Sequence, residues 1–166
     1  MHISQPLCYY MDNIISSVLT YSDKYDMIMK KVNIKGGNIM PEYLDINSDK
    51  ENISLVFYIE NKNIMEIGSK IERINSDAYM NGYNWEAFLN YYLQKQSPDV
   101  LENMDSDPEA GMYIAYYENV PENVVKVNKL EEIIEYLIEN PDDIYEIVRE
   151  HGNEIEWDWH YSNKFL

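Results

Sequence analysis

The sequence is poor in the residues that build cross-linked or membrane-embedded proteins. Cys8 is its only cysteine, which excludes an internal disulfide and a cysteine-based zinc site. Six glycines and six prolines among 166 residues argue against a long disordered tail. Apolar runs such as 55–59 are far shorter than the roughly 20 residues of a membrane-spanning helix, and 1–13 lacks the features of a secretory signal. These absences predict a reduced, cytoplasmic protein.

Patterns typical of common catalytic sites are also missing. The pair Gly36-Gly37 lacks the spacing of a phosphate-binding or dinucleotide-binding loop. The three histidines, His2, His151 and His160, are dispersed, so no helical pair of metal ligands is formed. The residues therefore predict no catalytic site, no metal site and no cofactor, and we expect that the chain is not an enzyme.

Acidic residues are in large excess. The chain carries 30 acidic and 13 basic residues, a net charge of −17. Eighteen of the acidic residues but only three basic ones lie in 99–158, so this segment accounts for −15 of the total. Such a surface repels nucleic acid and anionic lipid and attracts cationic partners. We therefore expect neither nucleic acid nor a membrane as a partner, although composition alone leaves a purely solubilising role open.

One stretch, MDSDPEAGMYIAYYE, places three carboxylates directly before an aromatic run. Asp105, Asp107 and Glu109 match the first three acidic positions of the helix-loop-helix calcium motif. Ala110, however, replaces the glycine that the motif requires next, and Tyr116 stands where its last glutamate belongs. The pattern predicts an exposed turn rather than a calcium site. It leaves open a reactive pair of carboxylates in a cleft.

Two stretches have the β-branched and aromatic composition of buried strands. They are SLVFYIEN at 54–61 and GMYIAYYEN at 111–119. In the second stretch, Tyr113, Ala115 and Tyr117 alternate with neighbours that are equally apolar, so both faces of the strand are apolar. We expect this strand to lie inside a sheet, next to the first.

Four segments have the apolar periodicity of amphipathic helices. They are 63–75, 84–97, 130–138 and 140–151. Asparagine is a favoured residue at helix N-caps, which makes Asn63, Asn84 and Asn140 the predicted caps. Pro98 should stop the second helix, and Gly152 is predicted to end the last one in the left-handed conformation.

The two ends of the chain are less informative. We interpret 1–50 as a divergent N-terminal portion with a helical stripe at 14–19 and a strand at 26–35. The alternating aromatic residues at 157–161 suggest a short edge strand. Taken together, the sequence predicts a single α+β domain over 1–166, in which helices pack on an antiparallel or mixed sheet and the C-terminal region is helical and acidic.

Two motifs resemble those of one known family. N-G-Y-N-W at 81–85 begins a helix, and D-P-E-A-G-M at 107–112 leads into a strand and then an acidic helical region. With the strand at 54–61 before them, they resemble the immunity protein 51 family of bacterial polymorphic-toxin systems. The resemblance covers a core at 54–151. Asn84 stands where the family has aspartate, a change that keeps an N-cap and removes one charge.

The resemblance implies a protein that binds and neutralises a cognate toxin domain, without catalytic residues of its own. The charge pattern favours a basic toxin and an acidic contact surface. Because buried aromatic side chains often dominate the energy of an interface, an aromatic anchor with a charged rim is expected. The predicted partner-binding residues are Tyr116, Trp157, Asp105, Asp107, Glu109 and Glu118.

Two other functions stay open at this point. One is an acidic interaction or regulatory module with a basic partner outside toxin systems. The other is a hydrolase that uses the carboxylates at 105–109. A toxin gene next to the gene of this chain would favour immunity. A pocket that strongly raises the pKa of a carboxylate would favour the hydrolase.

Overall fold

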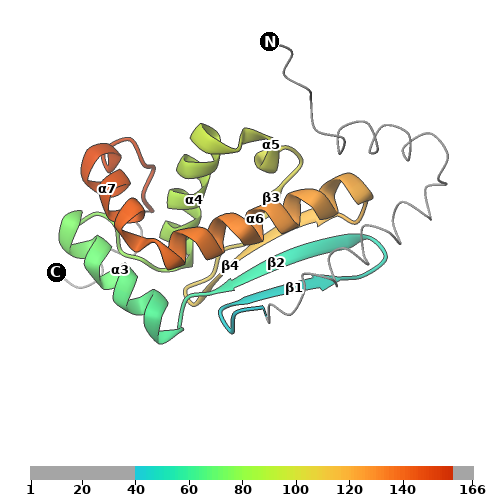
Figure 1. Ribbon diagram of the computed structural model, residues 1–166, viewed down its shortest axis with the longest axis horizontal. Helices are drawn as coiled ribbons and strands as arrows, with labels where there is room; N and C mark the ends of the chain where they lie inside the picture. Colours follow the sequence, from blue (N-terminus) through green and yellow to red (C-terminus); the bar gives the residue numbers. More distant parts are fainter. Residues whose placement is uncertain (1–39, 159–166) are drawn as a thin grey trace, which may run out of the picture.

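The computed structural model describes residues 40–158, which form a sheet and a set of helices (Figure 1). The predicted α+β class is confirmed. In chain order the elements are β1 (Leu44–Ser48), β2 (Asn52–Tyr58), α3 (Lys62–Ile74), α4 (Gly82–Gln96), α5 (Pro98–Leu101), β3 (Asp105–Ser106), β4 (Met112–Glu118), α6 (Pro121–Glu139) and α7 (Pro141–His151).

The four strands form one antiparallel sheet in the order β1-β2-β4-β3. The two predicted strands, β2 and β4, are the central pair, with Leu55 opposite Ala115. A tight turn joins β1 to β2, in which the Asp49 carboxylate accepts the backbone N–H groups of Glu51 and Asn52 at 2.8 Å each. These hydrogen bonds lower the pKa of Asp49, because they stabilise its charged form.

The inner face of the sheet is the hydrophobic one. Leu55, Phe57, Tyr113 and Ala115 all point to it and are fully buried. The alternation of side chains along each strand sends their neighbours to the opposite face. Each fully buried leucine or phenylalanine side chain contributes about 1.5–3 kcal/mol, so this face is a main source of stability.

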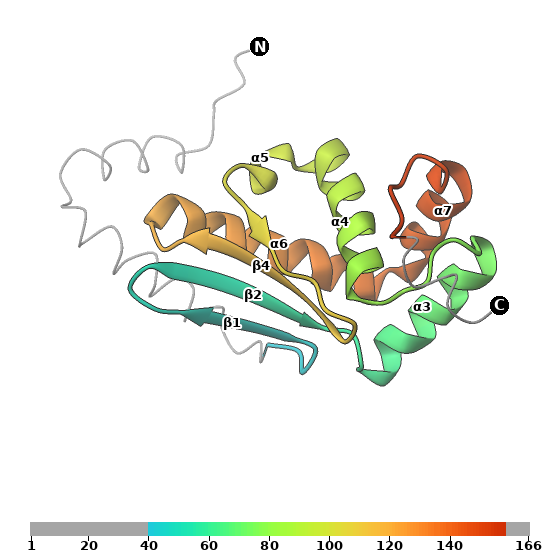
Figure 2. The ribbon, with the colours of Figure 1, turned by 180° about the vertical axis from the view of Figure 1, so that it is seen from behind.

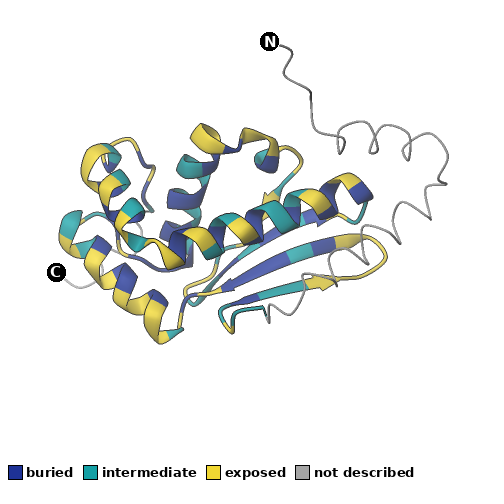
Figure 3. Cartoon of the chain, in the orientation of Figure 1, coloured by how far each residue is buried: buried dark blue, intermediate teal, exposed yellow. Residues whose placement is uncertain are grey.

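Helices α4 and α6 cover the inner face, as Figures 1 and 2 show from opposite sides. Burial follows this arrangement, since each helix carries a stripe of buried residues on one side (Figure 3). Trp85 of α4 meets Phe57 of β2 edge to face, with ring centroids 5.2 Å apart, and it meets Phe88 in the same manner at 6.2 Å. The aromatic face of α4 is therefore part of the core.

Helices α3 and α7 lie side by side at one end of the sheet (Figures 1 and 2). Lys70 of α3 links them, because its Nζ lies 4.0 Å from the ring centroid of Tyr145 and 3.8 Å from the Asp142 carboxylate. Gly152 follows α7 where space is short, since a Cβ there would lie 2.6 Å from the Asn75 side-chain nitrogen.

Several predicted helix ends need correction. The N-caps of α3 and α4 are Asn61 and Asn81, whose side chains accept N–H groups at 3.0 Å, and not Asn63 and Asn84. A cap accepts from the N–H two or three residues ahead, and each predicted cap is itself the donor to the true one. Asn140 precedes α7 as predicted but makes no side-chain cap, because its amide donates back to the Tyr136 carbonyl.

Other differences concern the C-terminal region and the short elements. Gly152 has right-handed backbone angles, φ −56° and ψ −26°, and not the predicted left-handed ones, because its N–H still closes the last helical turn onto Val148. Trp157 lies outside any strand. The ends of α3 at Ile74 and of α4 just before Pro98 agree with prediction. The predicted features at 14–19, 26–35 and 159–161 lie outside the described residues.

Candidate partner-binding surface

The acidic stretch at 105–109 contains the edge strand β3 and leads into the turn of a hairpin with β4. Asp105 of β3 pairs with Tyr116 of β4. The pairing continues beyond β3, where the Asp107 N–H donates to the Ile114 carbonyl at 2.9 Å. Glu109 forms a bridge with Met112, its N–H donating to the Met112 carbonyl at 2.8 Å. The stretch is thus held by backbone hydrogen bonds, and its carboxylates are exposed.

This register sorts the side chains into two parallel rows. Residues directly opposite each other in an antiparallel pair project to the same face. Asp105, Asp107 and Glu109 therefore lie beside the half-buried β4 residues that point away from α4 and α6. We call this side of the sheet the outer face. Its apolar and acidic rows consist of Met112, Ile114 and Tyr116 on β4 and of Asp105, Asp107 and Glu109 beside them.

The outer face extends across β2 and to the end of β4. Val56 and Tyr58 of β2 stand opposite Ile114 and Met112. Tyr58 is exposed and widens the apolar area, whereas Val56 is buried. At the end of β4 the exposed Glu118 stands opposite Asn52 and adds a carboxylate. The structure thus brings five of the six predicted partner-binding residues to one side of the sheet.

Trp157, the sixth predicted residue, is placed elsewhere. Its side chain is only 4% exposed, and its indole N–H donates to the Gly152 carbonyl at 2.8 Å. This tryptophan is therefore part of the core and anchors the segment after α7. We leave it out of the surface.

The two sequence motifs meet at a single joint between α4 and the hairpin turn. The Gly82 N–H donates to the Ala110 carbonyl at 3.3 Å, so the first turn of the helix touches the turn before β4. A Cβ on Gly82 would overlap the carbonyl oxygens of Glu109 and Met112. The glycine is required here because two stretches of backbone come into direct contact. Sequence reasoning missed this contact, although both motifs contain glycine.

Asn84 has a structural role that its sequence position does not suggest. It is fully buried, and its amide donates to the Tyr79 carbonyl at 2.6 Å. Its side-chain oxygen accepts the Asp158 N–H at 2.6 Å, so α4 is tied to the segment after α7. Asparagine supplies a donor and an acceptor at once, whereas an ionised aspartate is an acceptor only.

Hydrogen bonds lower the pKa of several carboxyls in the described residues. Three carboxyls, Asp49, Asp99 and Glu154, have a pKa below the ordinary value. For Asp99 the main cause is the hydrogen bond from Lys129, and for Glu154 it is the hydrogen bond with His151. A general acid at neutral pH needs a shift in the opposite direction.

Two further features concern residues 40–158, the part of the chain that the structure describes. No group of three or more His, Cys, Asp or Glu side chains is arranged to hold a metal ion. Among the helices of this part of the chain, none combines the length and the apolar character required to span a membrane.

Comparison with known protein families gives a match. The sequence profile of the family described as Immunity protein 51 matches residues 44–153. Comparison with curated proteins and with solved structures gave no significant match. The matched stretch runs from β1 to just beyond α7, and so it begins earlier than the core expected at 54–151. Because the match covers more than half of the 166 residues and includes both motifs of the joint, the chain belongs to the immunity protein 51 family.

Proposed function

We propose that this chain is an immunity protein that binds a cognate bacterial toxin domain through the outer face and so neutralises it. Family membership supports a toxin as the partner. The observation that carries the location is the pairing of an apolar row on β4 with an acidic row beside it. The protein acts by occupying the toxin and has no catalytic step of its own.

The apolar row supplies the centre of the proposed interface. Energetically important interface residues are commonly aromatic and are surrounded by polar residues that exclude water. Tyr116 fits this description, since it is half-buried between Asp105 on β3 and Ser54 on β2. Ile114 and Met112 extend the apolar contact along the strand. Tyr116 is therefore the proposed anchor.

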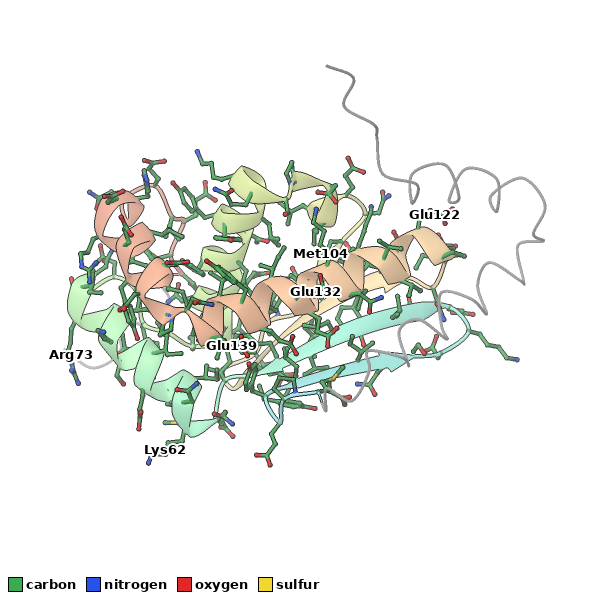
Figure 4. The ribbon with its side chains drawn as sticks, viewed as in Figure 1. Lys62, Arg73, Met104, Glu122, Glu132 and Glu139 are labelled. Carbon is green, nitrogen blue, oxygen red and sulfur yellow. The ribbon has the colours of Figure 1, made fainter. Side chains whose placement is uncertain are left out.

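The acidic row supplies the rim and defines the chemistry of the partner. Asp105, Asp107, Glu109 and Glu118 contribute a formal charge of −4 to this side of the sheet, and Asp45, opposite Val56, adds a further carboxylate. The same sign continues on the rest of the molecule, where Glu122, Glu132 and Glu139 lie along α6 (Figure 4). The acidic row itself attracts a basic toxin domain and repels nucleic acid. The toxin domain and this chain are proposed to meet in the cytoplasm.

Co-expression with the cognate toxin in a sensitive bacterial strain tests this function. Wild type should restore growth. The outer-face variant should protect poorly, because four rim charges are lost while side-chain shape is kept. It carries the substitutions Asp105→Asn, Asp107→Asn, Glu109→Gln and Glu118→Gln.

A matched control separates local from total charge. The control variant also loses four carboxylates, all exposed and located on α3, α6 and α7. It carries the substitutions Glu66→Gln, Glu132→Gln, Glu139→Gln and Glu146→Gln. It should protect like wild type. Failure of wild type to protect, or equal protection by the outer-face and control variants, would contradict the proposal.

A further inference from the structure

A groove lies between α4 and the segment that follows α7. On one side it is lined by residues of the solvent-facing side of α4, and on the other by residues 154–158. Its volume is about 380 Å³, near the lower end of the roughly 300–1,000 Å³ that is typical of ligand sites. The side chains that determine its chemistry are Tyr83, Glu86, Tyr91, Glu154, Glu156 and Asp158.

The walls of the groove are fixed from within the fold. The Asn84 side-chain oxygen accepts the Asp158 backbone N–H, and the Trp157 indole N–H fixes the segment by donating to the Gly152 carbonyl. Across the groove, the Tyr91 hydroxyl donates to the Glu154 carboxylate at 3.1 Å. These hydrogen bonds fix the position of the two walls of the groove relative to each other.

A cation lies beside two of the residues that line the groove. Lys95 is about half exposed, and its Nζ lies 3.9 Å from the Glu154 carboxylate. The same Nζ is 5.3 Å from the ring centroid of Tyr91, within the range of a cation–π contact. This lysine shows that the wall formed by Tyr91 and Glu154 accepts a primary ammonium group. The groove itself has four carboxylates, so its formal charge remains −3 when Lys95 is included.

The groove also borders β3, the edge strand that carries Asp105 of the acidic row. Ser106 of β3 points to the inner side of the sheet, and its hydroxyl donates to the Glu86 carboxylate on the groove wall. Asp105 and Asp107, the residues on either side of it, belong to the acidic row of the outer face. One partner that covers β3 therefore reaches both the outer face and the groove.

We infer that this groove receives an arginine or lysine side chain projecting from the bound toxin, an inference that rests on the proposed function. Charge complementarity selects a cationic group, and the lining includes Tyr83 and Tyr91, aromatic residues of the kind against which a guanidinium stacks. The volume of about 380 Å³ is sufficient for one or two side chains. Lys95 contacts Tyr91 and Glu154 in the free protein, and the incoming side chain competes with it for these two residues.

The first test uses a defined probe, the peptide acetyl-tetraarginine-amide, titrated into the full chain at 50 mM salt and followed by NMR. The amides of Ala87, Asn90 and Gln94 on the groove wall should shift most. The variant Glu86→Gln/Glu156→Gln should weaken peptide binding about threefold to tenfold, the range expected for the loss of two partly screened charge pairs. Its control, Glu66→Gln/Glu122→Gln, has the same net charge and should change binding less than twofold.

A second variant gives an effect of opposite sign that damage to the fold does not imitate. Lys95→Met removes the competing cation, so the peptide should bind about twofold to fivefold more tightly. The matched change Lys62→Met, at an exposed ion pair on α3, should leave peptide affinity within twofold of wild type. Shifts spread evenly over the surface, or equal effects of the groove variants and their controls, would overturn the inference.

The toxin itself separates this inference from the proposed function. If wild type binds the toxin and Glu86→Gln/Glu156→Gln binds it less tightly than the control pair does, both stand. If the groove variant binds the toxin as tightly as the control pair, the groove is refuted and the immunity function remains. If wild type does not bind the toxin at all, the proposed function fails, and with it the toxin as the source of the cationic side chain.

Discussion

Replacing Gly82 with alanine should destabilise the protein strongly, although helix propensity alone predicts the opposite. Gly82 is the first residue of α4, and alanine is the better helix former by about 0.8–1.0 kcal/mol. The new Cβ would, however, overlap two backbone carbonyl oxygens and lie 2.8 Å from the Met112 carbonyl carbon. Since both obstacles are backbone, no side-chain rotation relieves them.

The size of the effect follows from this geometry. Inserting a methyl group into a tightly packed place usually costs about 1–3 kcal/mol. The cost at Gly82 should lie at the upper end of this range, because the overlap is removed only if the 109–112 turn moves away from α4. We expect a loss of about 3 kcal/mol, a large share of the roughly 5–15 kcal/mol that stabilises a typical domain. At a urea m-value of about 2 kcal/mol per M, the midpoint falls by roughly 1.5 M.

Urea unfolding, followed by tryptophan fluorescence and by far-ultraviolet circular dichroism, measures this loss. Gly111→Ala is the matched control, because it lies in the same joint but faces only the Glu60 side chain, with the nearest atom at 3.3 Å. That side chain can move aside, so the control should lose less than about 1 kcal/mol. A Gly82→Ala protein as stable as wild type would refute the role of the joint.

Three further predictions follow from buried contacts and from the acidic stretch. Asn84→Ala should cost about 2–4 kcal/mol in urea unfolding, because it removes two buried hydrogen bonds, one to the Tyr79 carbonyl and one from the Asp158 N–H; a loss below 1 kcal/mol would contradict this. Tyr117→Phe should cost about 1 kcal/mol, since it removes a 2.8 Å hydrogen bond to a carbonyl. Burial raises the pKa of the Tyr117 hydroxyl well above its usual value, so the contribution of this group to the free energy of unfolding is complete below pH 10 and is lost as the pH rises above 10. Above pH 10 the free energy of unfolding of the variant should therefore fall less steeply than that of wild type, by up to about 1.4 kcal/mol per pH unit. An equal slope for the two proteins would count against this prediction. Calorimetric titration with calcium and zinc should detect no site tighter than roughly millimolar, and a micromolar site abolished by Asp107→Ala would overturn this.

The parts of the fold that the sequence predicts are those with a strong periodic pattern. The strands β2 and β4 are recognisable because their apolar runs are long and rich in β-branched and aromatic residues. Helix α3 is recognisable from isoleucines that recur every three to four residues, three of which are buried. In these segments local pattern and tertiary burial agree, so the pattern alone is sufficient.

The other elements depend on contacts that no local pattern contains. Strand β3 has two exposed residues, and it exists only because β4 supplies its hydrogen-bond partners. Strand β1 has a mixed sequence, LDINS, and pairs with β2 through a tight turn. The burial of Trp157 depends on Gly152 as a hydrogen-bond acceptor, and its aromatic character alone suggests an exposed anchor equally well.

The candidate surface was predictable in composition but not in arrangement. The sequence identifies Asp105, Asp107 and Glu109 as an acidic group before a strand. Only the register shows that each carboxylate stands beside one apolar residue of β4 on the same face. The groove is not predictable from the sequence, because its walls come from α4 and from 154–158, which are far apart in the sequence.

The association rate of the purified cognate toxin domain, measured by stopped-flow from about 50 to 500 mM salt, tests the central claim most directly. Screening changes strongly over this range. For wild type the rate should fall by about tenfold or more, as expected for electrostatically steered association. The outer-face variant should associate more slowly at low salt and depend less on salt than the control variant of equal net charge. A rate for wild type that is independent of salt, or an outer-face variant that associates as fast as the control, would contradict binding through the acidic outer face.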